Sequence, residues 1–152
     1  MGIGPSTKET TLHHFRDPLI DILSKDLDVE LAGIVIVGTP QDNSDKLFVG
    51  ERVASIIEAS RADGVIISVD GWGNSHVDFS NTIEKIGLLG VPLVGVSFVG
   101  TQGKFVVTNK YMDTIVDINK SEAGIETEVL GENNLTALDA KKALALLKLK
   151  MR

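Results

Sequence analysis

The sequence predicts an α/β fold of three layers, a mainly parallel sheet with helices on both faces, in a Rossmann-like or flavodoxin-like topology. The first observation is that three runs of consecutive apolar, β-branched residues alternate with two segments of helical periodicity. The second is that each run ends in a polar segment rich in glycine. A β-α-β-α-β series implies a parallel sheet with right-handed crossovers. The length of 152 residues predicts one domain, 1–152.

The first predicted element is a helix, because apolar residues at 12, 15, 19, 22 and 23 form one stripe. Pro18 lacks a backbone donor, so we expect this helix to begin near Asp17 or to be kinked there. The core elements that follow are strands at 31–37, 65–69 and 91–98, with helices at 47–62 and 77–89 between them. Further short strands are expected within 104–107, 113–118 and 126–130.

Thr136 is predicted to cap a final helix, with Asp139 in its first turn. This helix carries more apolar residues than one buried face needs, because two leucines lie outside the main stripe. We expect homo-oligomerisation to bury the excess, although neighbouring loops could also cover it. The stripe is Ala143, Leu144, Leu147 and Met151, and the two outside it are Leu146 and Leu149.

Charge is distributed unevenly along the chain, which has 15 basic and 21 acidic residues and a formal net charge of −6. Residues 141–152 hold five cations and no carboxylate side chain. Lysines in the last turns of a helix complement its negative end, and a docking surface for an acidic partner is the alternative. The overall acidity argues against nucleic-acid binding.

The absence of cysteine excludes a disulfide scaffold, a zinc finger and cysteine-ligated clusters within these residues. With three histidines and no H-E-x-x-H spacing, no metal site is expected. Neither phosphate-loop nor dinucleotide-binding glycine patterns occur, so no nucleotide cofactor is expected. No apolar run reaches about 18 residues and residues 1–11 hold no apolar signal core, so we expect a soluble, cytoplasmic domain without membrane contact.

Ligands of open parallel sheets bind beyond the carboxyl ends of the strands. Here those ends lead into the segments 38–43, 70–76 and 99–104. Asn74 or Ser75 can cap the following helix, whose N-terminus could hold a carboxylate. The alternative is a capped turn whose histidine bonds a loop carbonyl. The binding candidates are Asp70, Asn74, Ser75, His76, Asp78, Thr101 and Gln102.

Two adjacent histidines, His13 and His14, follow the hydroxyl residues Thr10 and Thr11. Imidazoles suit proton transfer near neutral pH, and the hydroxyls could orient a carbonyl or an amine. Neighbouring side chains on a helix point about 100 degrees apart, so the pair does not simply chelate one metal. The alternative is that one histidine packs and the other is solvated.

The segments Ser6-Thr-Lys-Glu-Thr-Thr-Leu-His-His-Phe-Arg-Asp-Pro18 and Asp63-Gly-Val-Ile-Ile-Ser68, with Gly71-Trp-Gly-Asn74, closely resemble the D-proline reductase proprotein family. The sequence is similar more broadly to component B subunits of glycine, sarcosine and betaine reductases of amino-acid-fermenting anaerobes. The likeness covers nearly the whole chain and matches the carboxyl-terminal, processed portion of those proproteins.

The resemblance implies oxidoreductase chemistry of the Stickland reaction. In the family the precursor cleaves itself before a cysteine, which becomes an N-terminal pyruvoyl group. That carbonyl condenses with the substrate amine, and a selenocysteine or cysteine of a partner subunit attacks, opening D-proline to 5-aminovalerate. The resemblance also implies that Thr10, Thr11, His13 and His14 would surround the pyruvoyl.

This sequence departs from the family where the cysteine would stand, because Met1-Gly2-Ile3-Gly4 occupies that place. We therefore expect a paralogous accessory or structural subunit of a D-proline reductase system, without a pyruvoyl group or the proprotein's amino-terminal portion, and not catalytic alone. The expected partners are other reductase subunits and an amino-acid ligand. One alternative is a sensor that binds proline-like amino acids. Another is an active reductase with a pyruvoyl formed from Ser6, which Pro5 and the family's use of cysteine disfavour.

Overall fold

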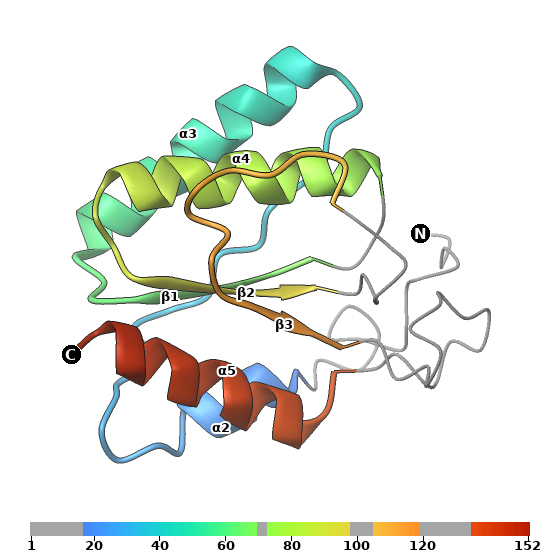
Figure 1. The fold of residues 1–152 in the computed structure, drawn as a ribbon. Coiled ribbons are helices and arrows are strands. Elements are labelled where there is room, and N and C mark those ends of the chain that lie inside the picture. Colours follow the sequence, from blue (N-terminus) through green and yellow to red (C-terminus); the bar gives the residue numbers. More distant parts are fainter. Residues whose placement is uncertain (1–16, 70–72, 98–104, 119–134) are drawn as a thin grey trace.

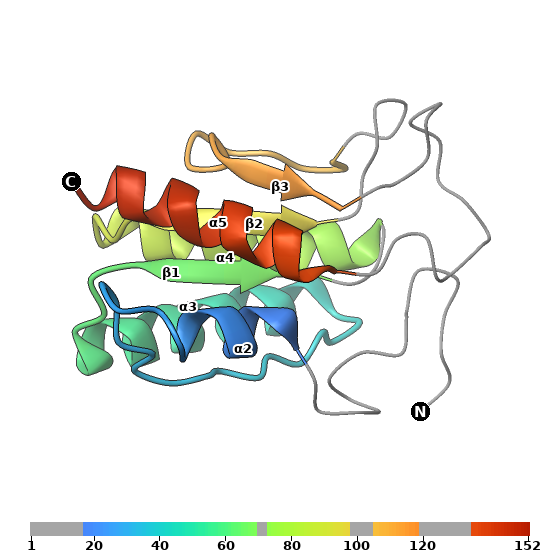
Figure 2. The ribbon, with the colours of Figure 1, turned by 90° about the horizontal axis from the view of Figure 1, so that it is seen from below.

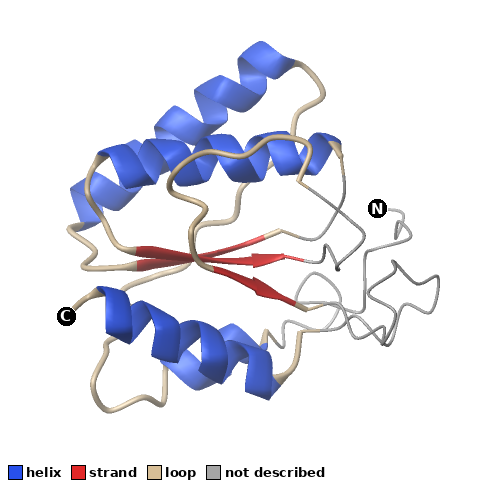
Figure 3. Ribbon diagram, viewed as in Figure 1, coloured by secondary structure: helices blue, strands red, loops and turns tan. Residues whose placement is uncertain are grey.

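The computed structural model describes residues 17–69, 73–97, 105–118 and 135–152. A three-stranded sheet lies between two layers of helices, as Figures 1 and 3 show. Helices α3 (Asn43–Ser60) and α4 (Asn74–Leu88) cover one face, and α2 (Pro18–Leu23) and α5 (Ala137–Lys150) cover the other. The predicted three-layer α/β fold is confirmed.

The sheet consists of β1 (Val65–Ser68), β2 (Leu93–Ser97) and β3 (Ile115–Asp117), in the order β1-β2-β3 with both pairings parallel. These strands fall inside the ranges predicted from the sequence. Residues 105–107 form no strand, and 104 and 126–130 lie outside the described residues. In open α/β sheets, ligands bind where the strand order reverses. The order of the described strands does not reverse, so it does not mark a ligand site.

Helices α3 and α4 pack closely because Gly50 faces Asn81. A Cβ at Gly50 would lie 2.1 Å from the Asn81 amide nitrogen, so a side chain there would displace the buried Asn81 side chain. The Asn81 amide donates to the Lys46 carbonyl at 3.3 Å, and Lys85 pairs with Glu51 at 3.0 Å. The two helices thus form one closely packed layer over the sheet.

The opposite layer begins where the sequence predicted it. The carboxylate of Asp17 accepts from the Leu19 backbone at 2.9 Å, and Pro18 opens the helix. Helix α5 begins with the capping box formed by Thr136 and Asp139, which confirms the predicted cap. Figure 2, the view from below, shows the two helices on the near side of the sheet, where they contact each other.

Each face of the sheet has its own apolar core. Between the sheet and the α3 and α4 layer lie six buried residues, Val53, Ala54, Phe79, Ile83, Ile86 and Leu93. On the α2 and α5 side lie Val94, Val96, Val116, Ala143 and Leu147. Because alternate residues of a strand face opposite ways, β2 supplies residues to both cores. That explains why its run of five residues is buried throughout.

The strand predicted at 31–37 is wrong for this structure. The segment forms no strand, and Ile34, Val35 and Ile36 are 59%, 38% and 85% exposed. Only its end contacts the core, where Val37 packs on the α3 side. A cavity lies between the segment and the edge of β1 that no described strand occupies, and the two backbones do not pair. An apolar run alone does not distinguish a strand from extended chain that lacks such a partner.

The final helix bears out the predicted apolar stripe in part. Ala143, Leu144 and Leu147 are buried, whereas Met151 is 38% exposed. Of the two extra leucines, Leu146 packs against the core on the α2 and α5 side, and Leu149 is 64% exposed. Homo-oligomerisation stays a prediction.

The lysines at the end of α5 contact carboxylates of the same chain. Lys148 lies 2.6 Å from Asp26 and 2.8 Å from Asp28, and Lys150 lies 2.6 Å from Asp113. The hydrogen bonds from the lysines lower the pKa of Asp26 and Asp113. These two lysines therefore fasten the helix to its own fold. No helix in the described ranges has the length and apolarity to cross a membrane.

Candidate functional site at the carboxyl edge of the sheet

Four of the predicted binding residues lie in the first turns of α4, at the carboxyl edge of the sheet. Asn74 is exposed, Ser75 is half-buried, and His76 and Asp78 are buried. The remaining candidates lie outside the described residues. They are Asp70, Thr101 and Gln102, together with Thr10, Thr11, His13 and His14 of the amino-terminal motif.

The predicted capping by Asn74 or Ser75 is wrong. The cap residue is Gly73, which has φ 52° and ψ −96°, a backbone that favours glycine. Gly73 accepts from the His76 backbone through its carbonyl at 3.1 Å. Asn74 begins the helix and donates through its side chain to Gln41 at 3.4 Å. This turn places His76 inside the helix, where its ring is directed to the protein interior.

His76 is 3% exposed, and neither ring nitrogen has a hydrogen-bond partner among the described residues. Its ring lies 4.8 Å from that of Phe105, which stacks on Phe79. The predicted alternative, a histidine bonded to a loop carbonyl, is therefore not found there. Burial lowers the pKa of His76, because the apolar surroundings disfavour the imidazolium. The ring is neutral near pH 7 and has donor and acceptor capacity unused.

Asp78 forms a buried ion pair with Lys46 of α3. The Lys46 nitrogen lies 2.5 Å from Oδ2 of Asp78, and their side chains are 1% and 7% exposed. The other oxygen, Oδ1, has no hydrogen-bond partner in the described part of the chain. A buried carboxylate normally has both oxygens satisfied, so this oxygen has an acceptor site left over.

Ser97 ends β2 and adds a third buried polar group. It is fully buried, and its hydroxyl has no partner within the described ranges. Ser97 shares a strand face with Gly95, whose missing Cβ would contact Phe79 and Ile83 of α4. The hydroxyl thus faces the layer of α4, the helix that carries His76 and Asp78. We call His76, Asp78 and Ser97 the buried polar cluster.

A cavity of about 960 Å³ runs along the outer edge of β1, which pairs with no other described strand. Its walls come from α3, α4, α5 and the segment 29–37, and Asp78 and Thr82 of α4 border it. Asn74, Ser75 and His76 do not line it, so only Asp78 of the four described binding candidates borders this cavity. Asp70 itself is outside the described residues.

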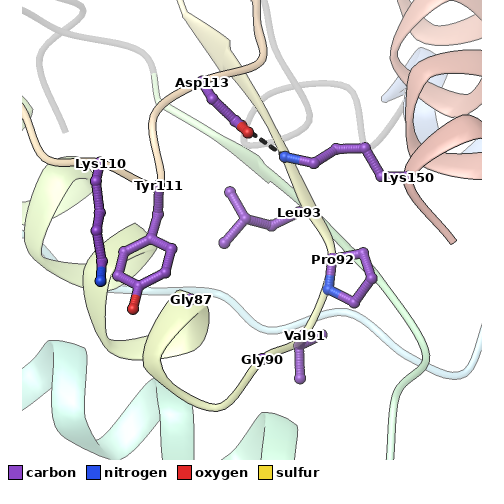
Figure 4. A pocket seen from close by; sticks show the side chains of 9 residues that line it. All are labelled: Gly87, Gly90, Val91, Pro92, Leu93, Lys110, Tyr111, Asp113 and Lys150. Atoms are coloured by element: carbon purple, nitrogen blue, oxygen red, sulfur yellow. Dashed lines mark hydrogen bonds and ion pairs between the residues drawn. The ribbon is translucent and has the colours of Figure 1, made fainter.

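A second, smaller cavity of about 240 Å³ lies at the opposite edge, between the end of α4 and the start of β2 (Figure 4). The Lys150 and Asp113 ion pair borders it, and the Lys110 nitrogen lies 4.9 Å from the centre of the Tyr111 ring. Both lysines therefore have partners within the fold. This cavity is remote from the carboxyl ends of the strands, where the buried polar cluster lies.

Sequence reasoning missed two residues of the site, Lys46 and Ser97. Ser97 gave a weak signal, because a hydroxyl interrupts an otherwise apolar run. Lys46 gave none, since lysines in the first turns of a helix are usually solvated. Within the described ranges, no three His, Cys, Asp or Glu side chains gather in a way that could hold a metal. The Thr and His residues that the resemblance places around a pyruvoyl are not among those described.

The fold is that of an α/β protein with polar residues at the carboxyl edge of its sheet. Comparison with known sequences identifies the protein family. Residues 2–129 match the family of glycine/sarcosine/betaine reductase component B subunits, and the chain belongs to that family. The resemblance inferred from the Thr-Thr-x-His-His and Gly-Trp-Gly-Asn segments is thereby confirmed.

Two curated relatives carry the comparison further. The chain is 46% identical over 146 residues to the D-proline reductase proprotein PrdA of Acetoanaerobium sticklandii, covering 96% of this chain and 23% of that protein. It is 29% identical over 106 residues to the sarcosine reductase complex component B subunit alpha of Peptoclostridium acidaminophilum, covering 67% of this chain and 25% of that one. The chain thus spans about a quarter of the length of these relatives. No solved structure matches it.

Proposed function

We propose that this chain is an accessory subunit of an amino-acid reductase system of the D-proline reductase type, with no pyruvoyl group of its own. The observation that carries the proposal is 46% identity to a D-proline reductase proprotein over 96% of the chain. The proposed lack of a pyruvoyl group rests on composition. The 152 residues contain no cysteine, which the resemblance implies is the pyruvoyl precursor. The role is therefore assembly with, or support of, a subunit that carries the carbonyl.

A pull-down tests the assembly. The tagged chain is expressed in an amino-acid-fermenting anaerobe and isolated under anaerobic conditions, beside a tagged α/β protein of similar size and charge. The proposal predicts that reductase subunits copurify in fixed proportion with this chain and not with the control. Recovery of the chain without reductase subunits, at low salt and after mild crosslinking, contradicts it.

A second candidate function is binding of proline-like amino acids as a sensor. The buried polar cluster supports it, because Asp78 Oδ1, the Ser97 hydroxyl and both His76 nitrogens lack partners among the described residues. Such groups cost stability unless something satisfies them, and a ligand does so when it binds. Calorimetry with D-proline, L-proline and glycine tests this function. Heat and a thermal shift with D- or L-proline support it, and the absence of both contradicts it.

A further inference from the structure

We infer that the outer faces of α3 and α5 form a contact between copies of this chain. The α5 face of one copy packs on the α3 face of the next copy, so each copy uses its two faces with two different neighbours. This contact joins copies of one chain, so it is independent of the accessory role, which joins the chain to other reductase subunits.

The outer face of α5 exposes apolar side chains. Leu138 and Leu149 are 75% and 64% exposed, and Lys142 and Ala145 between them are exposed as well. The four residues recur at intervals of four, three and four, so they lie along one side of the helix. We call Leu138, Lys142, Ala145 and Leu149 the α5 face. Exposed apolar groups that gather on one surface mark contacts with other proteins, so this face predicts a protein neighbour.

The outer face of α3 has the same spacing. Phe48, Arg52, Ser55 and Ala59 are exposed and also recur at intervals of four, three and four. Phe48 is 57% exposed, and the guanidinium carbon of Arg52 lies 5.5 Å from the centre of its ring. Ser55 and Ala59 are small, so a second helix can approach α3 closely there. We call these four residues the α3 face, and a leucine from another copy can fill the space beside its small side chains.

The charges around the two faces are opposite. Lys141 and Lys142 have no carboxylate partner among the described residues, and residues 141–152 hold no carboxylate side chain. Asp45 and Glu58 lie within one turn of members of the α3 face, so both flank it. Neither has an ion-pair partner in the described part of the chain. Opposite charges across a contact select the partner, so α5 docks on α3 and not on another α5, where lysines would face lysines.

Helices α3 and α5 lie on opposite sides of the sheet, as Figure 1 shows. Their outer faces therefore point away from each other, and one neighbour cannot cover both. A contact between two different faces is heterologous, so each copy leaves one face open for the next copy. Such contacts close into a ring or continue as a row of copies, depending on the rotation between neighbours. Association therefore continues beyond a pair.

Sedimentation velocity of the full chain over a range of concentrations tests the contact. One helix on one helix buries less than the roughly 800 Å² per partner of a standard interface, so association is weak and rises with concentration. We expect species larger than a dimer, and we expect about 0.5 M salt to weaken the association at least threefold, because salt screens exposed charges. A chain that stays monomeric at about 1 mM in low salt, or one that stops at a dimer, overturns the inference.

Single variants test each face. Leu149→Asp alters the α5 face and Phe48→Asp alters the α3 face, and both side chains are exposed, so neither change removes core packing. Each variant alone should self-associate at least tenfold more weakly than the parent. Leu88→Asp is the matched control, because Leu88 is 63% exposed at the end of α4 and belongs to neither face. The control should change self-association less than twofold.

A mixture of the two variants distinguishes contact between unlike faces from contact between like faces. The Leu149→Asp chain keeps an intact α3 face and the Phe48→Asp chain keeps an intact α5 face, so the mixture should form a 1:1 complex that grows no further. Contact between two α5 faces instead predicts no complex in the mixture and unchanged self-association of the Phe48→Asp chain. Either of those two results, with a parent that associates, overturns the inference.

Discussion

Lys46 and Asp78 join the two helices above the sheet through a buried ion pair of 2.5 Å. The pair links the first turn of α3 to the first turns of α4, at the edge where the strands end. Its neighbourhood also holds Asn81, which donates to the Lys46 carbonyl. A charge pair in this position orients Asp78 and fixes the two helix starts relative to each other.

Asp78→Asn is expected to lower the free energy of unfolding by about 3 to 5 kcal/mol, because it leaves the Lys46 ammonium buried without its counter-charge. Urea unfolding followed by circular dichroism measures the loss. The double variant Lys46→Met, Asp78→Leu should recover most of it, since an apolar pair needs no counter-charge. A single variant as stable as the parent would show that the pair contributes nothing.

His76 should make stability depend on pH. Its folded pKa is lowered from 6.5 by burial, so the unfolded chain binds the proton more tightly. The stabilising contribution is present above pH 6.5 and is lost as the pH falls from there through the lower folded pKa. Urea midpoints measured from about pH 8 to about pH 5 should fall in the parent and fall less in His76→Phe. Parallel curves for the two chains would contradict this prediction.

Ile83→Ala should cost about 2 to 5 kcal/mol, because the side chain is fully buried between α4 and the sheet and its removal leaves a cavity. Ile56 provides the matched control, since it is 49% exposed on α3. Its replacement by alanine should cost well under half as much. Thermal and urea unfolding of the two variants test whether the core on the α3 and α4 side lies around Ile83. Equal losses of stability for both variants would contradict that placement.

Thr136→Ala should lower the free energy of unfolding by about 0.5 to 2 kcal/mol. The Thr136 hydroxyl accepts from the Asp139 backbone N–H and donates to the Asp139 carboxylate, and alanine removes both hydrogen bonds. Thr136→Ser keeps the hydroxyl and serves as the control. Unfolding of both variants measures the cap. If serine and alanine destabilise the chain to the same extent, the hydroxyl has no capping role.

The sequence predicted those parts of the fold that local chemistry determines. Asp17 and Pro18 marked one helix start and Thr136 and Asp139 another, because caps and proline act within a single turn. The runs around β1 and β2 were found because strands buried on both faces are continuously apolar. The segment 31–37 has the same pattern, yet strand formation also needs backbone pairing, which composition does not report.

The site was predicted only in part, for a related reason. His76 and Asp78 were found because they follow a glycine-rich strand end. Lys46 lies 32 residues from Asp78 in the sequence, so the packing of α3 against α4 alone brings the two side chains together. Ser97 lies on β2, and it is buried only because the sheet packs against the helices. The capping by Asn74 or Ser75 failed because Gly73 adopts a backbone that places the helix start one residue earlier.

Intact-mass spectrometry of the reductase isolated from cells, with a carbonyl-specific reagent applied before analysis, tests the proposed accessory role. An accessory chain without a pyruvoyl group should be present in the reductase fractions as a polypeptide that contains residues 1–152 unbroken and takes up no reagent. The subunit that carries the pyruvoyl group should take up one equivalent in the same sample. Absence of this polypeptide from those fractions, or a cleaved form of it that carries the reagent, would contradict the accessory role.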